Sequence, residues 1–460
     1  MKCAALFLAL QPALWADAPV PASDPTSCTA GSSESCYLAD KNAVNQPLDT
    51  QTRGLAVPNR LIESDMNMFV NPGQLVNYGT AYLEGWLGSN LVWGGATVPM
   101  PANQKLAIFL RRPLNLNSPL GATESLFSKY PESGFLNGGG STFTGDTSAT
   151  TGSAFSILDR AKKGFGNLDL MYGIAIGKLN FGARLSYANV KHSQEKTDST
   201  ANYTAKFNTN SHNIGAGLGV QVKDLGPGYL DVALSSDFPI VKLEYNNQIA
   251  AGSENLTINS GTPFSLGILT RYVMPVGQDK LIVAVNVDTF KVPYEIRGAT
   301  TANVQRSRDG STKVLNVAFD VAYHQNFQEG KLKIIYSTGV GSTSSTLAMA
   351  DNITPAIYNN ELSITNFFIP LGVAAEHKTF ETLKTRIGVR KNVISNKKTV
   401  DKTATTSNTT ETSFYSDDEL TVAMGLGWTP AEKVQIDLAM NANAFKLDTF
   451  FSAISARYHY

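Results

Sequence analysis

The sequence predicts an all-β fold: a transmembrane, antiparallel, up-and-down β-barrel of about 14–16 strands, preceded by an N-terminal periplasmic arm or hatch. Three observations lead to this prediction. Apolar and polar residues alternate over most of the chain, short and long connections alternate with each other, and the final stretch "TFFSAISARYHY" is strand-like and ends on an aromatic residue. Successive side chains of a strand point to opposite faces, so the alternation indicates a sheet with one apolar face and one polar face.

Charge and hydropathy exclude several other classes. The 460 residues contain 38 basic and 38 acidic side chains, and this balance argues against a nucleic-acid partner or a polybasic membrane patch. Beyond the N-terminus we find no run of about 18 apolar residues, so the sequence predicts no transmembrane helix. A chain of this length often forms two soluble domains, but no linker separates its halves.

The N-terminus predicts export. Residues 1–18, "MKCAALFLALQPALWADA", carry a lysine, an apolar run and small residues at Ala16 and Ala18, which is typical of a secretory signal peptide. A buried helix is the alternative interpretation. Export leaves Cys28 and Cys36 as the cysteines of the mature chain, and an oxidising compartment predicts a disulfide between them. Two free thiols are the alternative.

The barrel strands follow from segments such as "LNFGARLSY" (179–187) and "VQIDLAMN" (434–441), in which every second residue is apolar. We expect sixteen strands, with fourteen as the next choice, at approximately 78–87, 90–99, 104–112, 167–177, 179–192, 209–222, 229–246, 262–275, 281–292, 313–326, 331–345, 361–377, 383–396, 417–428, 433–445 and 449–460. An even number returns the chain to the side on which it started.

The connections between these strands distinguish a barrel from a sandwich. Short connections are expected at 177–180, 223–228, 275–280, 328–331, 378–382 and 429–433. Long ones, rich in Ser, Thr, Asn and Gly, are expected near 193–208, 247–261, 293–311, 346–360 and 398–415. Short turns at one end and long loops at the other are typical of outer-membrane barrels. A water-soluble sandwich also alternates, but it gives no reason for this asymmetry.

The final strand fits the same fold. In a closed barrel it pairs with the first strand, and Tyr458 and Tyr460 would lie at the boundary between lipid and water. The segment resembles the C-terminal recognition signal of bacterial outer-membrane proteins. That resemblance implies the bacterial outer membrane as location, outer-membrane lipid as surroundings and the barrel assembly machinery as a partner during biogenesis.

Three regions follow the signal peptide. Residues 19–77 are predicted to form a periplasmic arm or hatch, residues 78–460 the barrel, and residues 113–166 a large extracellular loop. Asn71-Pro72-Gly73, directly before the first strand, resembles the Asn-Pro-Ala element of the FadL-like outer-membrane transporters of hydrophobic compounds. In that family a short N-terminal hatch occludes the lumen. This chain departs from the element by having Gly73 where alanine is usual.

Charged residues on the polar face of the strands are predicted to line the lumen, because an arginine or lysine facing lipid near the midplane costs about 2–4 kcal/mol. They are Asp169, Arg184, Asp231, Arg271, Asp288, Asp320, Lys384, Arg386, Arg390 and Asp437. Their mixed signs favour a general diffusion pore over an ion-selective one. The alternative is that the charges pair across the lumen and hold the barrel together.

Motifs for catalysis are missing from the sequence, including a Gly-x-Ser-x-Gly elbow, a P-loop and His-Glu-x-x-His. A barrel hydrolase would need a base such as His324 or His377, but a lone histidine on a strand is more often structural. We therefore predict no enzyme, no metal and no cofactor. The sequence favours a passive channel for small solutes, with uptake of hydrophobic solutes as the more specific version. The alternative is an adhesion or receptor barrel with a sealed lumen, whose loops bind a partner.

Overall fold

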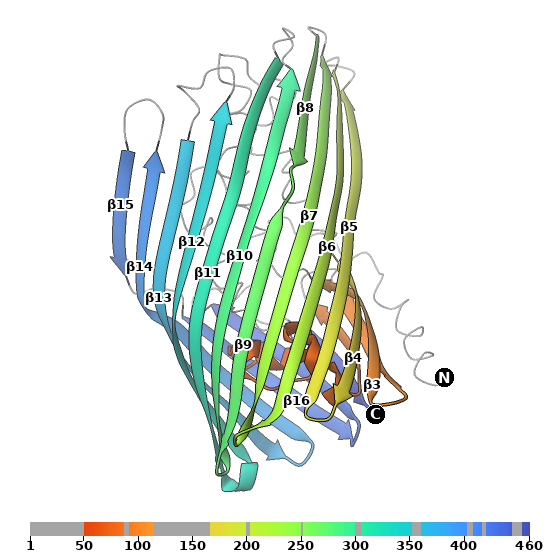
Figure 1. Ribbon diagram of the computed structural model, residues 1–460, viewed down its shortest axis with the longest axis vertical. Coiled ribbons are helices and arrows are strands. Elements are labelled where there is room, and N and C mark those ends of the chain that lie inside the picture. The colour runs from red at the N-terminus through yellow and green to blue at the C-terminus, as the bar shows by residue number, and fades with distance from the viewer. Residues whose placement is uncertain are drawn as a thin grey trace.

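The computed structural model describes residues 50–86, 92–113, 166–198, 203–249, 252–299, 305–351, 360–402, 408–415, 420–443 and 453–460. These form a closed antiparallel β-barrel with a short helical segment inside it (Figure 1). The predicted signal peptide, Cys28, Cys36 and nearly all of the predicted loop 113–166 lie outside the described residues. The sequence-based fold class is confirmed.

Eighteen strands make up the sheet. They are β1 Thr80–Trp86, β2 Val92–Met100, β3 Gln104–Pro113, β4 Gly166–Ile176, β5 Leu179–Asp198, β6 Tyr203–Leu225, β7 Gly228–Ile249, β8 Gly252–Ser260, β9 Phe264–Val276, β10 Asp279–Ala299, β11 Gln305–Phe327, β12 Leu332–Asp351, β13 Asn360–Phe380, β14 Leu383–Lys402, β15 Asn408–Tyr415, β16 Thr421–Ala431, β17 Val434–Asn443 and β18 Ala453–His459. Because β8 and β9 both pair with β7 and β10, and β15 and β16 both pair with β14, the wall has sixteen strand positions.

The barrel closes between its first and last strands. β1 pairs with β2 on one side and with β18 on the other, and the second register runs from Thr80 opposite His459 to Trp86 opposite Ala453. Each backbone amide and carbonyl in the wall can therefore find a partner in a neighbouring strand, as a bilayer requires.

Short connections occur at all six predicted places, after β4, β6, β9, β11, β13 and β16. Gly177, Gly226 and Gly277 begin three of them with φ of 59°, 62° and 64°. Side chains other than glycine rarely adopt this backbone conformation, so the positions of these three glycines follow from the turns.

The predicted long loops need correction. β5–β7 and β10–β14 are 20 to 23 residues long and continue through much of the segments predicted as loops, forming tall hairpins at one end of the barrel (Figure 1). About 9–11 residues suffice to cross a bilayer, so the rest of each hairpin projects beyond the membrane. The sequence of these segments is rich in Ser, Thr, Asn and charged residues, so the alternation that marks a membrane strand is lost although the backbone pairing continues.

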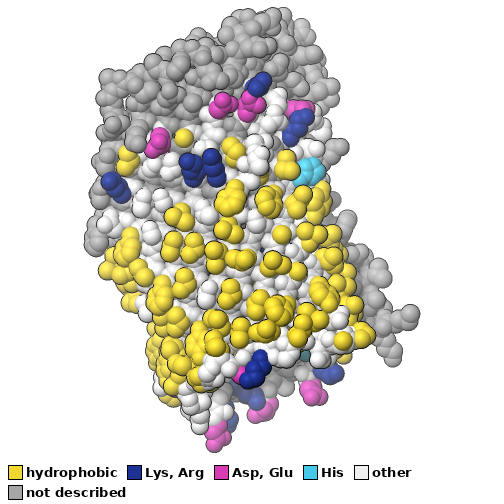
Figure 2. Space-filling view, viewed as in Figure 1, with side chains coloured by type: hydrophobic (Ala, Val, Ile, Leu, Met, Phe, Trp, Pro, Cys, Tyr) yellow, Lys and Arg dark blue, Asp and Glu magenta, His cyan; other side chains and the backbone are white. Residues whose placement is uncertain are grey.

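The two faces of the wall differ as predicted. Large apolar side chains on the outer face are exposed, among them Leu185, Leu218, Leu234, Phe319 and Val373. Figure 2 shows apolar side chains as a belt across the middle of the visible face, with charged groups above and below it. Inward-facing neighbours such as Ala322 and Ala374 are buried. No helix among the described residues is long and apolar enough to span a membrane.

Candidate functional site

A segment inside the barrel, residues 50–77, forms the candidate site, and we call it the hatch. It consists of α2 Thr50–Arg53, η3 Asn59–Leu61, α3 Asn67–Val70 and η4 Pro72–Asn77. Figure 1 shows it within the end of the barrel that carries the short turns. The hatch is predicted from sequence as a region, but none of its helical turns is.

Asn71-Pro72-Gly73, whose sequence resembles a hatch element, lies at the start of η4. The Asn71 side chain accepts a hydrogen bond from the Gly73 amide at 2.9 Å, which satisfies one of the free amides at the start of a helical turn. Pro72 occupies the first position of the turn, where its missing N–H leaves no hydrogen bond unmade. Asparagine and proline therefore fix the local geometry from which the hatch contacts the wall.

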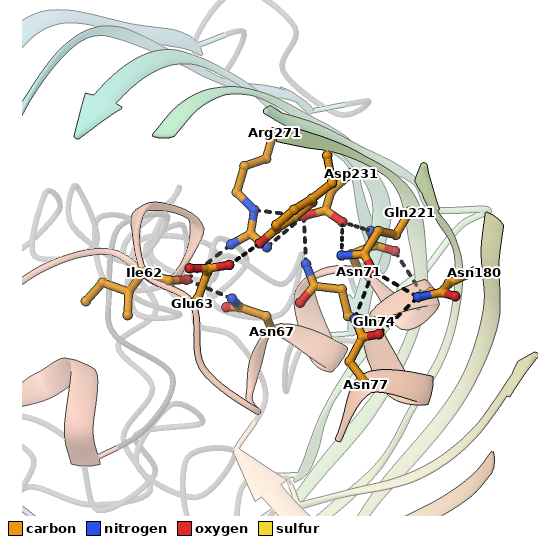
Figure 3. A network of polar contacts seen from close by, with 12 residues as sticks. Ile62, Glu63, Asn67, Asn71, Gln74, Asn77, Asn180, Gln221, Asp231 and Arg271 are labelled. Carbon is orange, nitrogen blue, oxygen red and sulfur yellow. Dashed lines mark hydrogen bonds and ion pairs between the residues drawn. The ribbon is translucent and has the colours of Figure 1, made fainter. Parts of the chain in front are cut away.

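Asp231, on β7, is the centre of the polar contacts between hatch and wall (Figure 3). Its two carboxylate oxygens accept five hydrogen bonds: two from Arg271 at 2.7 and 2.9 Å, and one each from Asn71, Gln74 and Gln221 at 3.0, 2.7 and 3.1 Å. Asn71 and Gln74 belong to the hatch, whereas Arg271 and Gln221 belong to β9 and β6. One buried carboxylate thus joins the hatch to three adjacent strands.

Two side chains extend this network on either side. Arg271 also donates to the Ile62 carbonyl at 3.1 Å, and the Asn67 amide donates to the same carbonyl at 2.7 Å. Gln221 accepts from Asn180 at 2.9 Å and from Asn77 at 2.8 Å (Figure 3). The network therefore holds the hatch from its middle to its last turn.

Further anchors lie around the rest of the circumference. On β11, Asp320 contacts Arg60 at 2.7 Å and His324 lies 2.8 Å from the Leu61 carbonyl. On β18, Arg457 donates to Asp65 at 2.6 Å, and on β1, Glu84 accepts from the Thr50 amide at 2.9 Å. On β5, Arg184 donates to the Phe69 carbonyl at 2.8 Å. Charge-assisted hydrogen bonds of this kind are the stronger ones in proteins. The hatch is therefore fixed to opposite sides of the barrel.

Glycines of the inner wall allow the hatch backbone to lie directly on the strands. A Cβ added at Gly182 would lie 2.1 Å from the carbonyl of Pro72, and one at Gly219 would lie 1.9 Å from the Asn71 side chain. A Cβ at Gly388 would lie 1.9 Å from the carbonyl of Leu55 on the other side of the barrel. Glycine within a strand often marks such a close approach of another backbone.

Gly73 itself lies in one of these contacts. A Cβ at this position would be 2.9 Å from the carbonyl oxygens of both Asn180 and Gly219. This explains why the chain has glycine where the resembling element has alanine: the hatch lies closer to β5 and β6 than a methyl group permits.

Apolar side chains fill the space between hatch and wall. Two buried clusters flank the hatch, one beside β9–β13 and one beside β1–β4. In the second, the ring of Phe69 lies 4.8 Å from that of Phe109 and 6.0 Å from that of Trp93, in edge-to-face arrangements. The hatch is therefore packed against two separate parts of the wall.

A bulge interrupts the wall beside this aromatic cluster. In β3 the register against β4 shifts between Phe109 and Arg112, and the intervening Arg111 has φ of 57°. Arg112 contacts Asp169 at 2.6 Å and lies over the Phe69 ring at 4.9 Å from its centroid. The bulge thus turns a basic side chain inward onto the hatch.

The predicted lumen residues are not free in an open channel. Asp169, Asp231, Asp320 and Asp437 each contact an arginine, and two of these arginines, Arg271 and Arg386, belong to the predicted set themselves. Lys384 lies 3.6 Å from Glu376, and Asp288 accepts from Asn286. Among the described residues Arg390 has no ion-pair partner. Most charges of the set therefore contact residues of nearby strands or of the hatch.

Several partners in these contacts are missing from the sequence-based set. They are Arg60, Glu63, Asp65, Glu84, Arg112, Glu376 and Arg457. The hatch residues lie in an irregular segment without periodicity, and Arg112 lies beside a bulge that breaks the alternation. Arg457, by contrast, follows the alternation of the last strand and could have been included.

The C-terminal aromatics lie where the last strand meets the first. Tyr460 is 46% exposed, its hydroxyl is 2.9 Å from that of Thr97, and its amide donates to the Gly79 carbonyl at 3.1 Å. The ring of Tyr458 lies 6.2 Å from that of Tyr460. Both tyrosines thus lie at the end of the barrel that contains the hatch.

The hatch is expected to loosen in acid because of Glu63. Burial raises the pKa of its carboxyl, but the charge of Lys280 and hydrogen bonds from Lys280 and Tyr229 lower it more, so the pKa lies below its ordinary value of 4.5. A lowered pKa means that the contribution to stability is complete above the unfolded value and is lost as pH falls through the folded value.

This expectation is testable by thermal unfolding at a series of pH values. The difference in melting temperature between the native chain and Glu63→Gln should shrink between about pH 6 and about pH 3. Glu381→Gln is the control, since this carboxylate is 85% exposed in a turn, where its ion pair with Lys378 contributes little to stability. A Glu63→Gln difference that is constant with pH would show that the charge of Glu63 does not hold the hatch.

Solved structures provide the only comparisons that give matches. No protein-family model matches the chain, and no curated protein matches it. A Pseudomonas aeruginosa FadL homologue is similar with a TM-score of 0.42 and 12% identity over 90% of this chain and 99% of its own. The Ralstonia pickettii toluene transporter TbuX gives 0.40 and 9% over 91% and 100%, and the Pseudomonas putida toluene transporter TodX gives 0.37 and 9% over 86% and 93%. At these identities the similarity concerns barrel architecture and assigns no solute to this chain.

Proposed function

We propose that the protein is an outer-membrane channel for small solutes in which the hatch is the gate, and that it favours hydrophobic solutes. One observation carries the proposal: the barrel encloses a segment of its own chain that is packed and hydrogen-bonded to opposite sides of the wall. A barrel of this size encloses a lumen wide enough for solutes when nothing fills it. Passage therefore requires that the hatch move.

The preference for hydrophobic solutes is supported by the composition of the wall beside the hatch. Side chains from β1–β4 place Tyr82, Trp93, Phe109 and Met171 against the hatch. Most charges of the inner wall are neutralised in ion pairs, so they leave little net field for attracting ions. An apolar solute would meet aromatic surface as soon as the hatch withdrew.

A surface barrel with a sealed lumen is the second candidate, and the tall hairpins favour it. Beyond the apolar belt their described parts carry exposed charged side chains (Figure 2), which suits binding of a partner. In this case the hatch would be a permanent part of the core, and no solute would pass.

Conductance and uptake distinguish the two candidates. The refolded mature protein is expected to be nearly silent in a planar bilayer, and a version without residues 19–72 is expected to show channel steps. Cells with the intact protein should take up a labelled monoaromatic hydrocarbon faster than cells without it. If the shortened version migrates as a folded, heat-modifiable barrel and is still silent, the channel proposal is wrong and the sealed barrel is favoured.

A further inference from the structure

Two lysines lie directly opposite each other on the outer face of neighbouring strands. Lys291 on β10 and Lys313 on β11 are register partners, and both are exposed. Within the described part of the chain neither has an ion-pair partner. Like charges placed directly opposite across two strands destabilise a sheet, so this pair needs a reason.

The pair lies at the edge of the apolar belt. Phe264 on β9 is the register partner of Lys291 and is 53% exposed, and Leu315, two residues from Lys313 on the same strand, is 45% exposed. Figure 2 shows basic groups just beyond the apolar belt, on the side of the tall hairpins. This is the level at which a bilayer changes from acyl chains to head groups.

The residues aligned with the two lysines on the next strands, β12 and β13, form a row with them and carry hydrogen-bond donors. Thr346 on β12 is the register partner of Lys313, Ser363 on β13 is the partner of Thr346, and their hydroxyls are 3.3 Å apart. The acidic residues of the same hairpin, Glu295 and Asp309, lie four residues further from the belt, about 13 Å along the strands. Arg297 pairs with Glu295. The row is therefore cationic at the lysines and rich in donors, and at its far end the Ser363 hydroxyl donates to the Glu361 carboxylate at 3.4 Å.

We propose that Lys291, Lys313 and Thr346 form a binding site for the phosphate groups of an anionic glycolipid in the outer leaflet. A phosphate between the two ammonium groups would replace their repulsion by attraction, and one of its remaining oxygens could accept from the Thr346 hydroxyl. The apolar side chains below the row would contact the acyl chains of the same lipid. This inference rests on the proposed location in the outer membrane, but not on the channel activity.

Lipid binding by the refolded full-length protein tests the site. The probe is bis-phosphorylated lipid A added to the protein in detergent, with the rise in melting temperature as readout. Each lysine near a membrane surface contributes about 1 kcal/mol, or about 5-fold in affinity, so Lys291→Gln with Lys313→Gln should weaken binding by about 25-fold. Lys242→Gln is the matched control: this outer-face lysine of β7 pairs with Glu244 at 2.8 Å, and its loss should change binding by less than about 2-fold.

The same variants distinguish a lipid-binding site from a pair of lysines whose mutual repulsion the fold only tolerates. Without lipid, Lys313→Gln should be at least as stable as the native chain, because the repulsion is removed. With lipid A, the native chain should be the more stable one. Equal binding by the double variant, equal binding of lipid A stripped of its phosphates, or equal stabilisation by inorganic phosphate alone would each overturn the proposal. None of these readouts depends on conductance, so a failure here and a failure of the channel proposal remain distinguishable.

Discussion

Asp231→Asn is expected to lower the free energy of unfolding by about 3–5 kcal/mol, which is the usual cost of breaking a buried ion pair from one side. The carboxylate is buried, accepts five hydrogen bonds and neutralises the equally buried Arg271. The asparagine amide keeps the shape of the side chain but removes its charge and one acceptor oxygen. Asn71 and Gln74 would then lose their main anchor on the wall.

Permeability should rise together with this loss of stability. Chemical unfolding in detergent measures the stability change, and conductance in a planar bilayer measures whether the hatch opens. Asp224→Asn is the control, because this carboxylate at the end of β6 pairs with Lys178 in the turn between β4 and β5, and both side chains are about 70% exposed. It should change neither quantity appreciably. A folded Asp231→Asn barrel as stable and as silent as the native chain would show that the Asp231 network does not hold the hatch.

Gly182→Ala is expected to displace the hatch while the barrel remains folded. The added methyl group would lie 2.1 Å from the Pro72 carbonyl and 2.5 Å from the Gly73 amide, and both of these are backbone atoms. They cannot turn away as a side chain can, so the hatch has to move as a unit. Overpacking of this kind costs about 1–3 kcal/mol, while alanine is readily accommodated in the strand itself.

Gly217→Ala provides the matched comparison. Gly217 faces the same side of the wall on the neighbouring strand, and a Cβ there meets nothing nearer than 3.6 Å. Both variants should show heat-modifiable migration of a folded barrel, but only Gly182→Ala should conduct more than the native chain. Equal conductance of the two variants would mean that the contact between hatch and wall at Gly182 does not restrict passage.

Taken together, the anchors suggest how one segment can close a wide barrel. The ion pairs, the glycine contacts and the two apolar clusters are spread over strands from β1 to β18. Loss of a single anchor should therefore loosen one side of the hatch first. Any opening in the native protein has to release several anchors together.

Much of the wall could be predicted from sequence, because a two-residue period is a local property of the chain. The period assigns Leu185 to the lipid side and Arg184 to the inside without knowledge of any partner. The short turns were predictable for the same reason, since a break in the alternation marks each of them. Where the sequence of a strand is rich in polar residues throughout, as in the tall hairpins, the local signal disappears, so the sequence predicts loops where the structure has paired strands.

The site depends on contacts that no local pattern encodes. Arg60 and Asp320 are 260 positions apart and Asp65 and Arg457 are 392 apart, so their pairing follows only from the closed barrel with the hatch inside it. Gly182 has the appearance of a weak point in a strand until the hatch backbone is placed against it. The sequence by itself determined which residues face inward, because side-chain alternation is a property of one strand. Only the tertiary structure decided what they contact there, because the hatch and the wall come together from distant parts of the chain.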